Sequence, residues 1–146
     1  MSKVSVKGVL IGAGVDVVAS VVLGLPIAFN AMLRVDLSHM PNAQASAAMA
    51  AAIHANVPLY VAQLLVGLAC SVLGGYMAAW LAKHDELLNG GLSSFLCVAL
   101  GIYTMASGKD SNALWVQVLM LLASPALALI GGDLMRRQRQ RRIQAT

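Results

Sequence analysis

The chain has 146 residues, of which 59% are hydrophobic and 11% are charged, and its formal net charge is +4. A soluble domain of this size cannot bury so much apolar surface, so the composition excludes a single water-soluble domain and predicts a membrane protein. Half of the basic residues form one terminal run beside an apolar segment, so the positive charge indicates membrane topology and no nucleic-acid partner.

The first predicted span covers residues 8–33, an apolar run bounded by Lys7 and Arg34. With a rise of about 1.5 Å per residue, a helix of this length crosses a hydrocarbon core of about 30 Å with some tilt. The run is longer than the apolar part of a cleaved signal peptide, and it contains Asp16. We therefore expect a transmembrane helix that remains in the protein.

Residues 34–57 form the longest predicted connection. Its second half is rich in alanine and is bracketed by Pro41 and Pro58, which are typical start and stop signals of a helix. Met49 and Ile53 lie one helical turn apart in this stretch. We therefore expect a short extramembrane helix with one side resting on the membrane surface or on the bundle.

Three further spans are predicted at residues 58–82, 87–106 and 113–135, and a basic tail follows at residues 136–146. The short separators between these spans indicate that neighbouring helices pack antiparallel as hairpins. The predicted fold is therefore all-α, a single membrane domain with a bundle of four transmembrane helices and one short extramembrane helix between the first two.

The basic residues are divided unevenly between the two sides of this topology. Lys3, Lys7, Lys83 and the five terminal arginines fall on one side, whereas Arg34 and Lys109 fall on the other. The positive-inside rule therefore places both termini in the cytoplasm of a bacterial cell, with the protein in the inner membrane.

Small residues recur every fourth position along the predicted spans. They are Gly8 and Gly12 in the first span, Gly67, Ser71, Gly75 and Ala79 in the second, and Ser124, Ala128 and Gly132 in the fourth. In lipid, helices associate through close backbone approach and polar contacts, and small residues permit both. We therefore expect these positions to pack helices together, with the second span at the centre of the bundle.

Asp16 lies in the cytoplasmic half of the hydrocarbon region, where a charged side chain near the helix centre costs about 2.5–3.5 kcal/mol. Two interpretations remain open. The residue is either a proton or cation relay, or a neutral acid hydrogen-bonded to a neighbour such as Ser20, Ser71 or Ser94. A relay usually needs a second titratable group, and the sequence indicates none at that depth.

Other polar side chains within the spans are predicted to hydrogen-bond between helices. They are Asn30, Gln63, Ser71 and Gln117. Cys70 and Cys97 form no CxxC pair and are expected to be small packing residues. His39 and His54 lack a third ligand nearby, so no metal site is predicted. No catalytic motif or cofactor fingerprint is present, and we expect no enzymatic activity and no cofactor.

Two sequence segments resemble a signature of small bacterial membrane proteins. One is residues 74–82, GGYMAAWLA, followed after a charged turn by residues 87–90, LLNG, and the other is residues 8–12, GVLIG, leading to Asp16. The resemblance covers the first helix and the second hairpin, and it implies a bundle of four spans. No activity is known for that family, so the resemblance assigns no role to Asp16. Four spans with an acid in the first are also loosely similar to the small multidrug transporters.

Three functions are compatible with these patterns. The first is an interaction or accessory protein that associates with itself or with another membrane protein, because small-residue grooves are abundant and polar groups are few. The alternative is a small proton- or cation-coupled transporter that uses Asp16. The third is electrostatic docking on anionic lipid or an acidic partner, at about 1 kcal/mol per residue near the surface. The residues for this docking are Arg136, Arg137, Arg139, Arg141 and Arg142.

Overall fold

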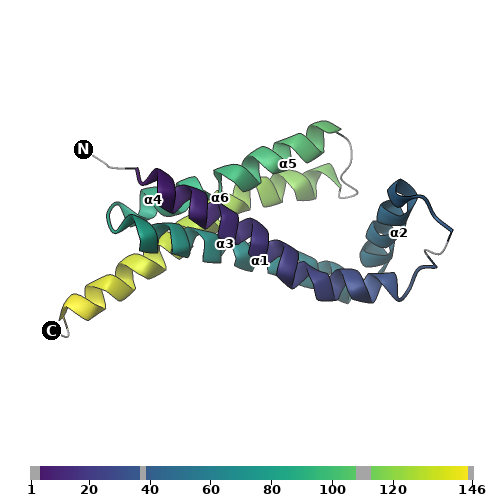
Figure 1. The fold of residues 1–146 in the computed structure, drawn as a ribbon, viewed down its shortest axis with the longest axis horizontal. Helices are drawn as coiled ribbons and strands as arrows, with labels where there is room; N and C mark the ends of the chain where they lie inside the picture. Colours follow the sequence, from purple (N-terminus) through teal and green to yellow (C-terminus); the bar gives the residue numbers. More distant parts are fainter. Residues whose placement is uncertain (1–3, 37–38, 108–112, 145–146) are drawn as a thin grey trace.

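The computed structural model describes residues 4–36, 39–107 and 113–144, which contain six helices and no strand (Figure 1). The helices are α1 (Val6–Met32), α2 (Asn42–Ala55), α3 (Val57–Ala82), α4 (Glu86–Ser93), α5 (Phe95–Ser107) and α6 (Leu114–Gln144). Four segments are long and apolar enough to cross a membrane: α1, α3, α4 together with α5, and α6. The predicted all-α bundle of four spans is confirmed, and the protein is a multi-pass membrane protein. The predicted separator at residues 108–112, and with it Lys109, lies outside the described residues, as does Lys3.

The extramembrane helix α2 occupies the predicted stretch, with Pro41 at its N-cap. Its end differs from the expectation, because Pro58 lies in the first turn of α3, where a missing N–H is tolerated, and does not stop α2. Asn56 separates the two helices and caps α3, accepting a hydrogen bond from the Leu59 N–H at 3.2 Å. Helix α2 lies against α1 and α3 at the end of the bundle away from the chain termini (Figure 1), and Ile53 lines a hollow together with residues of both helices.

The third span is interrupted, where the sequence predicted one continuous helix. Helix α4 ends at Ser93 and α5 begins at Phe95. The hydroxyls of Ser93 and Ser94 donate to the carbonyls of Gly90 and Gly91 at 2.6 and 2.8 Å. Such bonds compete with the regular hydrogen bonds of a helix. The two adjacent glycines have a low helix propensity and so do little to keep the helix continuous.

Helix α6 continues through most of the segment that was predicted as a tail, as far as Gln144. Two ion pairs favour this extension. Arg137 binds Asp133 one turn earlier in α6 at 2.6 Å, and Arg139 binds Glu86 at the start of α4. The predicted basic tail, residues 136–146, is therefore helical as far as Gln144.

Helix α3 is the central helix of the bundle, as predicted, and contacts α1, α4 and α6. Glycines bring α1 onto α3. A Cβ atom at Gly8 would lie 2.9 Å from the Ala78 carbonyl oxygen, and one at Gly12 would lie 2.6 Å from the Gly74 carbonyl oxygen. Ala79, also predicted to pack, is fully buried.

Glycines also bring α6 onto α3 and α4. Gly75 faces the backbone of Ala128, and Cβ atoms at either Gly75 or Gly131 would overlap the opposite helix. A Cβ atom at Gly132 would lie 2.7 Å from the Glu86 carbonyl oxygen. These contacts, with those of α1, make up a tightly packed region formed by the start of α1, the C-terminal part of α3, α4 and residues 128–135 of α6, which we call the closed half.

Beyond the closed half the helices separate into two pairs (Figure 1). One pair is α1 with α3, and the other is α5 with residues 114–124 of α6. Gly67 of α3 lies where the pairs have separated, and nothing lies within 4 Å of the place its Cβ would occupy. The predicted packing role of Gly67 is therefore wrong, although its spacing matches that of Gly75.

Candidate functional site

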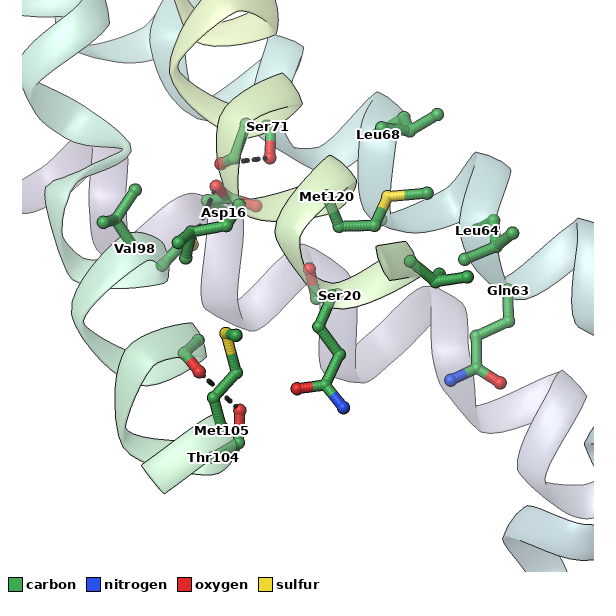
Figure 2. Close-up of a pocket in the computed structure, with 17 residues that line it drawn as sticks. Asp16, Ser20, Gln63, Leu64, Leu68, Ser71, Val98, Thr104, Met105 and Met120 are labelled. Atoms are coloured by element: carbon green, nitrogen blue, oxygen red, sulfur yellow. Dashed lines mark hydrogen bonds between the residues drawn. The ribbon is translucent and has the colours of Figure 1, made fainter. Parts of the chain in front are cut away.

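A pocket with a volume of about 300 Å³ lies between the two helix pairs, where they begin to separate (Figure 2). Its wall is mostly apolar, with Gln63 and Leu64 on one side and Thr104 and Met105 on the other. The polar side chains that line it are Asp16, Ser20, Gln63, Ser71, Cys97, Thr104, Gln117 and Ser124. They come from four helices, so the fold gathers groups that the sequence keeps far apart.

Asp16 borders the pocket next to the closed half and is only 3% exposed. Glycine makes room for it, because a Cβ atom at Gly74 would lie 2.8 Å from the Asp16 Cβ. The thiol of Cys97 on α5 donates a hydrogen bond to Asp16 Oδ2 at 3.1 Å. The partner is thus none of Ser20, Ser71 and Ser94, which the sequence suggested.

The contact between Asp16 and Cys97 corrects one expectation. Cys97 is a polar partner of Asp16 and not only a packing residue. A signal for this pairing was present in the sequence. Asp16 lies ten residues after Val6, where α1 starts, and Cys97 lies eleven residues after Glu86, where the third span starts. The two spans start at the same end of the bundle. With a rise of about 1.5 Å per residue, the two side chains therefore lie at a similar depth.

Ser71 and Ser124 lie 3.2 Å apart through their hydroxyl oxygens and join α3 to α6 in the pocket wall (Figure 2). This is the interhelical polar contact that was predicted for Ser71. Gln63 is exposed and Gln117 half-buried, and both line the pocket. Asn30 does not reach another helix, because its side-chain oxygen accepts the Arg34 Nε–H at 3.0 Å.

The pocket contains one acid and no base among the described residues that line it. A carboxylate surrounded by hydrocarbon needs a proton or a cation to compensate its charge. Hydroxyl and amide oxygens from Ser20, Ser71 and Gln63 are the ligand types that suit a cation beside the carboxylate. The cavity volume also admits a small organic molecule.

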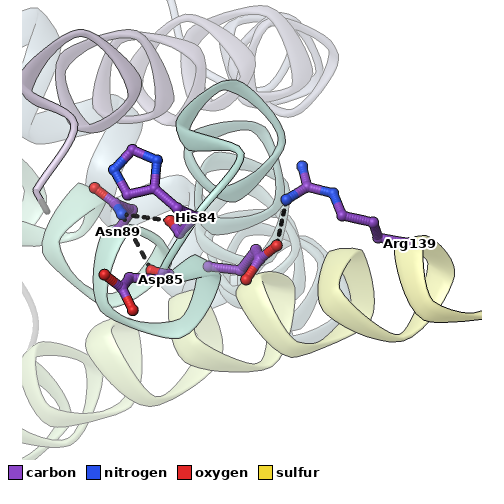
Figure 3. A network of polar contacts seen from close by, with 5 residues as sticks. His84, Asp85, Asn89 and Arg139 are labelled. Atoms are coloured by element: carbon purple, nitrogen blue, oxygen red, sulfur yellow. Dashed lines mark hydrogen bonds and ion pairs between the residues drawn. The ribbon is translucent and has the colours of Figure 1, made fainter. Parts of the chain in front are cut away.

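The closed half is held by a polar network that the sequence did not reveal (Figure 3). Asn89 is fully buried, accepts the Ser5 N–H at 2.7 Å, and donates to the carbonyls of His84 and Asp85 at 3.0 and 3.1 Å. It ties the start of α1 to the turn between α3 and α4. The ion pair of Arg139 with the acid that begins α4 joins α6 to the same turn.

The five arginines predicted to act at the surface divide into several roles. Arg137 and Arg139 bind acids of the chain itself. Arg136 and Arg141 are exposed, and Arg142 borders a surface groove. At least Arg137, Arg139 and Arg142 of the predicted positive patch therefore interact within the protein.

Comparisons with family models, with curated proteins and with solved structures found no match to this chain. A proposal about function therefore depends on the chemistry of the pocket and on the packing around it.

Proposed function

We propose that the protein is a small membrane carrier in which Asp16 exchanges a proton for a cation. The observation that carries the proposal is the position of Asp16, a buried carboxylate next to the closed half. It borders a pocket that has hydroxyl and amide groups and, among the described residues that line it, no base. This favours the transporter over the interaction protein among the functions expected from the sequence.

Charge compensation supplies the coupling in this proposal. An ionised carboxylate is expensive in hydrocarbon, so Asp16 holds either a proton or a cation. Arrival of the cation releases the proton into the pocket, and the proton returns when the cation leaves. Because the two occupants exclude each other, movement of one drives movement of the other. The thiol of Cys97 keeps the carboxylate oriented toward α5 in the proton-bound form.

Two features of the sequence that supported an interaction protein support it less once the positions of the residues are considered. Several of the small residues are occupied within the chain, as with Gly12 against Gly74 and Gly75 against Ala128, so these positions are not available to a partner. The polar groups are also gathered in one pocket. We further propose that the protein lies in a bacterial inner membrane with both termini in the cytoplasm, on the strength of its basic residues.

The experiment is proton-cation exchange in liposomes loaded with the pH-sensitive dye pyranine. An inward gradient of Na⁺, K⁺ or tetramethylammonium should make the interior more alkaline in the presence of the protein. Asp16→Asn should abolish this signal. Asp133→Asn is the matched control, because Asp133 is a carboxylate outside the pocket that pairs with Arg137. Exchange that persists in Asp16→Asn, or wild-type signals equal to empty liposomes with all three cations, would contradict the proposal.

A second candidate is association with another copy or another membrane protein along α5. The observation that favours it is that α5 contributes no buried residue. In a background of Cys70→Ala and Cys97→Ala, Ile102→Cys on α5 should form disulfide dimers in membranes if copies meet there. Val18→Cys is the control, since Val18 is similarly exposed on α1. Equal cross-linking of both variants, with only monomer in native mass spectrometry, would count against it.

A further inference from the structure

A second hollow lies between α1, α2 and α3, at the end of the bundle away from the chain termini. It has a volume of about 340 Å³. Its wall is apolar where it is farthest from the Asp16 pocket, with Ile27 and Ala28 of α1, Ile53 of α2 and Val66 of α3. No charged side chain lines it among the described residues. We call it the α2 hollow.

The α2 hollow adjoins the Asp16 pocket. Three residues line both cavities, and they are Ser20 of α1 with Gln63 and Gly67 of α3. Their hydroxyl and amide groups therefore stand between the carboxylate and the apolar wall. The two cavities form one elongated path along the groove between α1 and α3.

The length of this path follows from α1. Asp16, Ser20, Gly24 and Ala28 recur every fourth residue, so they lie along one side of the helix. With a rise of about 1.5 Å per residue, the distance along the helix from Asp16 to Ala28 is about 18 Å. An occupant that reached from the carboxylate to the far wall would have to be long and narrow.

Two glycines keep side chains out of the path. Gly24 lines the α2 hollow, and Gly67 lines both cavities. Nothing lies within 4 Å of the place that a Cβ atom would occupy at either residue. The helices are therefore not in contact at these positions, and the space beside each glycine is available to a ligand.

The order of chemistry along the path distinguishes an organic cation from an inorganic one. An acid lies at one end, hydroxyl and amide groups follow, and hydrocarbon lines the other end. An inorganic ion would use only the first part, because a small hydrated ion gains nothing from an apolar wall. An ammonium ion with an alkyl chain uses both parts. Each methylene that leaves water for an apolar surrounding favours binding by about fourfold.

We propose that the α2 hollow binds the linear alkyl chain of an ammonium ion whose charged group pairs with the Asp16 carboxylate. The chain passes Ser20 and Gly24 and ends against Ile53. This names the class of cation for the exchange proposed above, and it rests on that proposal for transport, although binding can be measured without transport.

Protection of Cys97 measures binding. Cys97 lines the Asp16 pocket, so an occupant should slow its modification by a charged methanethiosulfonate reagent. The Cys70→Ala protein in maltoside micelles is labelled at rising concentrations of ethyl-, butyl- or hexyltrimethylammonium. The concentration that halves the rate should fall about two- to fourfold with each added methylene. Hexanesulfonate, which has the same chain length and the opposite charge, should not protect.

Two isomeric ions test the shape of the site. Nonyltrimethylammonium and tetrapropylammonium have the same atoms and the same charge, but only the first has a chain long enough to enter both cavities. We expect the linear isomer to protect Cys97 at a concentration at least about tenfold lower, as several additional buried methylenes imply.

A matched pair of glycine variants separates the α2 hollow from partition of the chains into micelles. Gly24→Leu places a side chain in the hollow, where the structure leaves room for it. It should abolish the dependence on chain length and leave protection by tetramethylammonium unchanged. Gly14→Leu is the control, because Gly14 lies on the same helix with nothing within 4 Å of its Cβ position and lines neither cavity. This control should retain the wild-type dependence.

Three outcomes would overturn the proposal. Protection that did not depend on chain length would mean a site for the ammonium group alone. An equal dependence in Gly24→Leu and Gly14→Leu would mean partition into the micelle. Protection by hexanesulfonate at a similar concentration would mean an apolar site that does not use Asp16.

The pyranine assay distinguishes this proposal from exchange at Asp16. Protection that depends on chain length, together with no pH change in liposomes, would support the binding site and contradict the exchange. Exchange of Na⁺ or K⁺ together with protection that ignores chain length would support the exchange and overturn the α2 hollow as a binding site.

Discussion

At the scale of single residues, the packing of α3 against α6 depends on Gly75. A side chain at this position would overlap the carbonyl group of Ala128, and backbone cannot move aside as a flexible side chain can. Overpacking of a tight contact costs typically about 1–3 kcal/mol. We therefore predict that Gly75→Ala lowers the free energy of unfolding by about this amount. Unfolding by sodium dodecyl sulfate in mixed micelles, followed by circular dichroism, measures the change.

Gly67 supplies the control for Gly75 within the same helix. Nothing lies within 4 Å of the position that a Cβ atom would take at Gly67. Alanine is favoured over glycine in a helix by about 1 kcal/mol. Gly67→Ala should therefore be neutral or slightly stabilising in the same assay. Equal destabilisation by the two substitutions would show that α3 and α6 are packed differently.

At the scale of elements, α5 and the start of α6 diverge from the closed half, and each does so at a point where the helix is interrupted. The third span breaks at Ser94, and α6 contains Pro125. A proline inside a helix removes the hydrogen bond to the carbonyl four residues earlier, here that of Leu121, which lines the pocket. Both interruptions fall near the level of Asp16, where the two helix pairs begin to diverge toward the α2 end, whereas the closed half packs tightly toward the chain termini.

This arrangement predicts that Cys97 is reachable from one side of the membrane only. A charged, membrane-impermeant methanethiosulfonate reagent added on the side of α2 should modify Cys97, which lines the pocket. The same reagent added on the side of the termini should react far more slowly, because the closed half lies between. Mass spectrometry of the protein from right-side-out and inverted vesicles measures the modification.

Cys70 is the matched thiol for this measurement, since it is fully buried in α3 and does not line the pocket. Cys70→Ala should leave the labelling unchanged, and Cys97→Ala should abolish it from both sides. Rapid labelling of Cys97 from the side of the termini would contradict the closed half as a barrier.

At the scale of the whole molecule, the spans and α2 could be predicted because hydrocarbon imposes length and composition on each segment directly. The side of each helix that faces its neighbours could not be predicted, because it depends on how the helices rotate about their axes when they pack. Gly67 and Gly75 share one spacing, yet only Gly75 meets another helix, since the pairs have separated by the level of Gly67. The break at Ser94 was also hidden, because hydropathy does not register hydroxyls that bond back to the helix.

The candidate site was predictable only in part for the same reason. The burial of Asp16 followed from the position of a carboxylate in an apolar run, whereas its contact with Cys97 required two helices to be placed side by side. Asn89 is the clearest omission. An asparagine just inside the start of a span is ordinary in sequence, and its three hydrogen bonds connect segments 84 residues apart.

The placement of charge in the whole molecule leads to a prediction about orientation. The start of α1, the turn between α3 and α4 and the end of α6 lie at one end of the bundle, and α2 lies at the other (Figure 1). Most basic residues are at the first end, including exposed arginines of α6, such as Arg136 and Arg141, that form no ion pair within the described part of the chain. The cytoplasmic side retains such positive charge during insertion.

Replacing the four terminal arginines other than Arg139 by glutamine should therefore produce a mixture of orientations. The substitution lowers the number of basic residues on the side of the termini from eight to four, against two on the side of α2. Arg139 is kept so that its ion pair with Glu86 continues to hold α6. A green fluorescent protein fused after Thr146 should fluoresce in the wild type, and alkaline phosphatase at the same site should be inactive. The variant should lose part of the first signal and gain part of the second. Arg34→Gln, which removes a charge at the α2 end, should leave both unchanged, and an active phosphatase in the wild type would mean that the molecule lies the other way round.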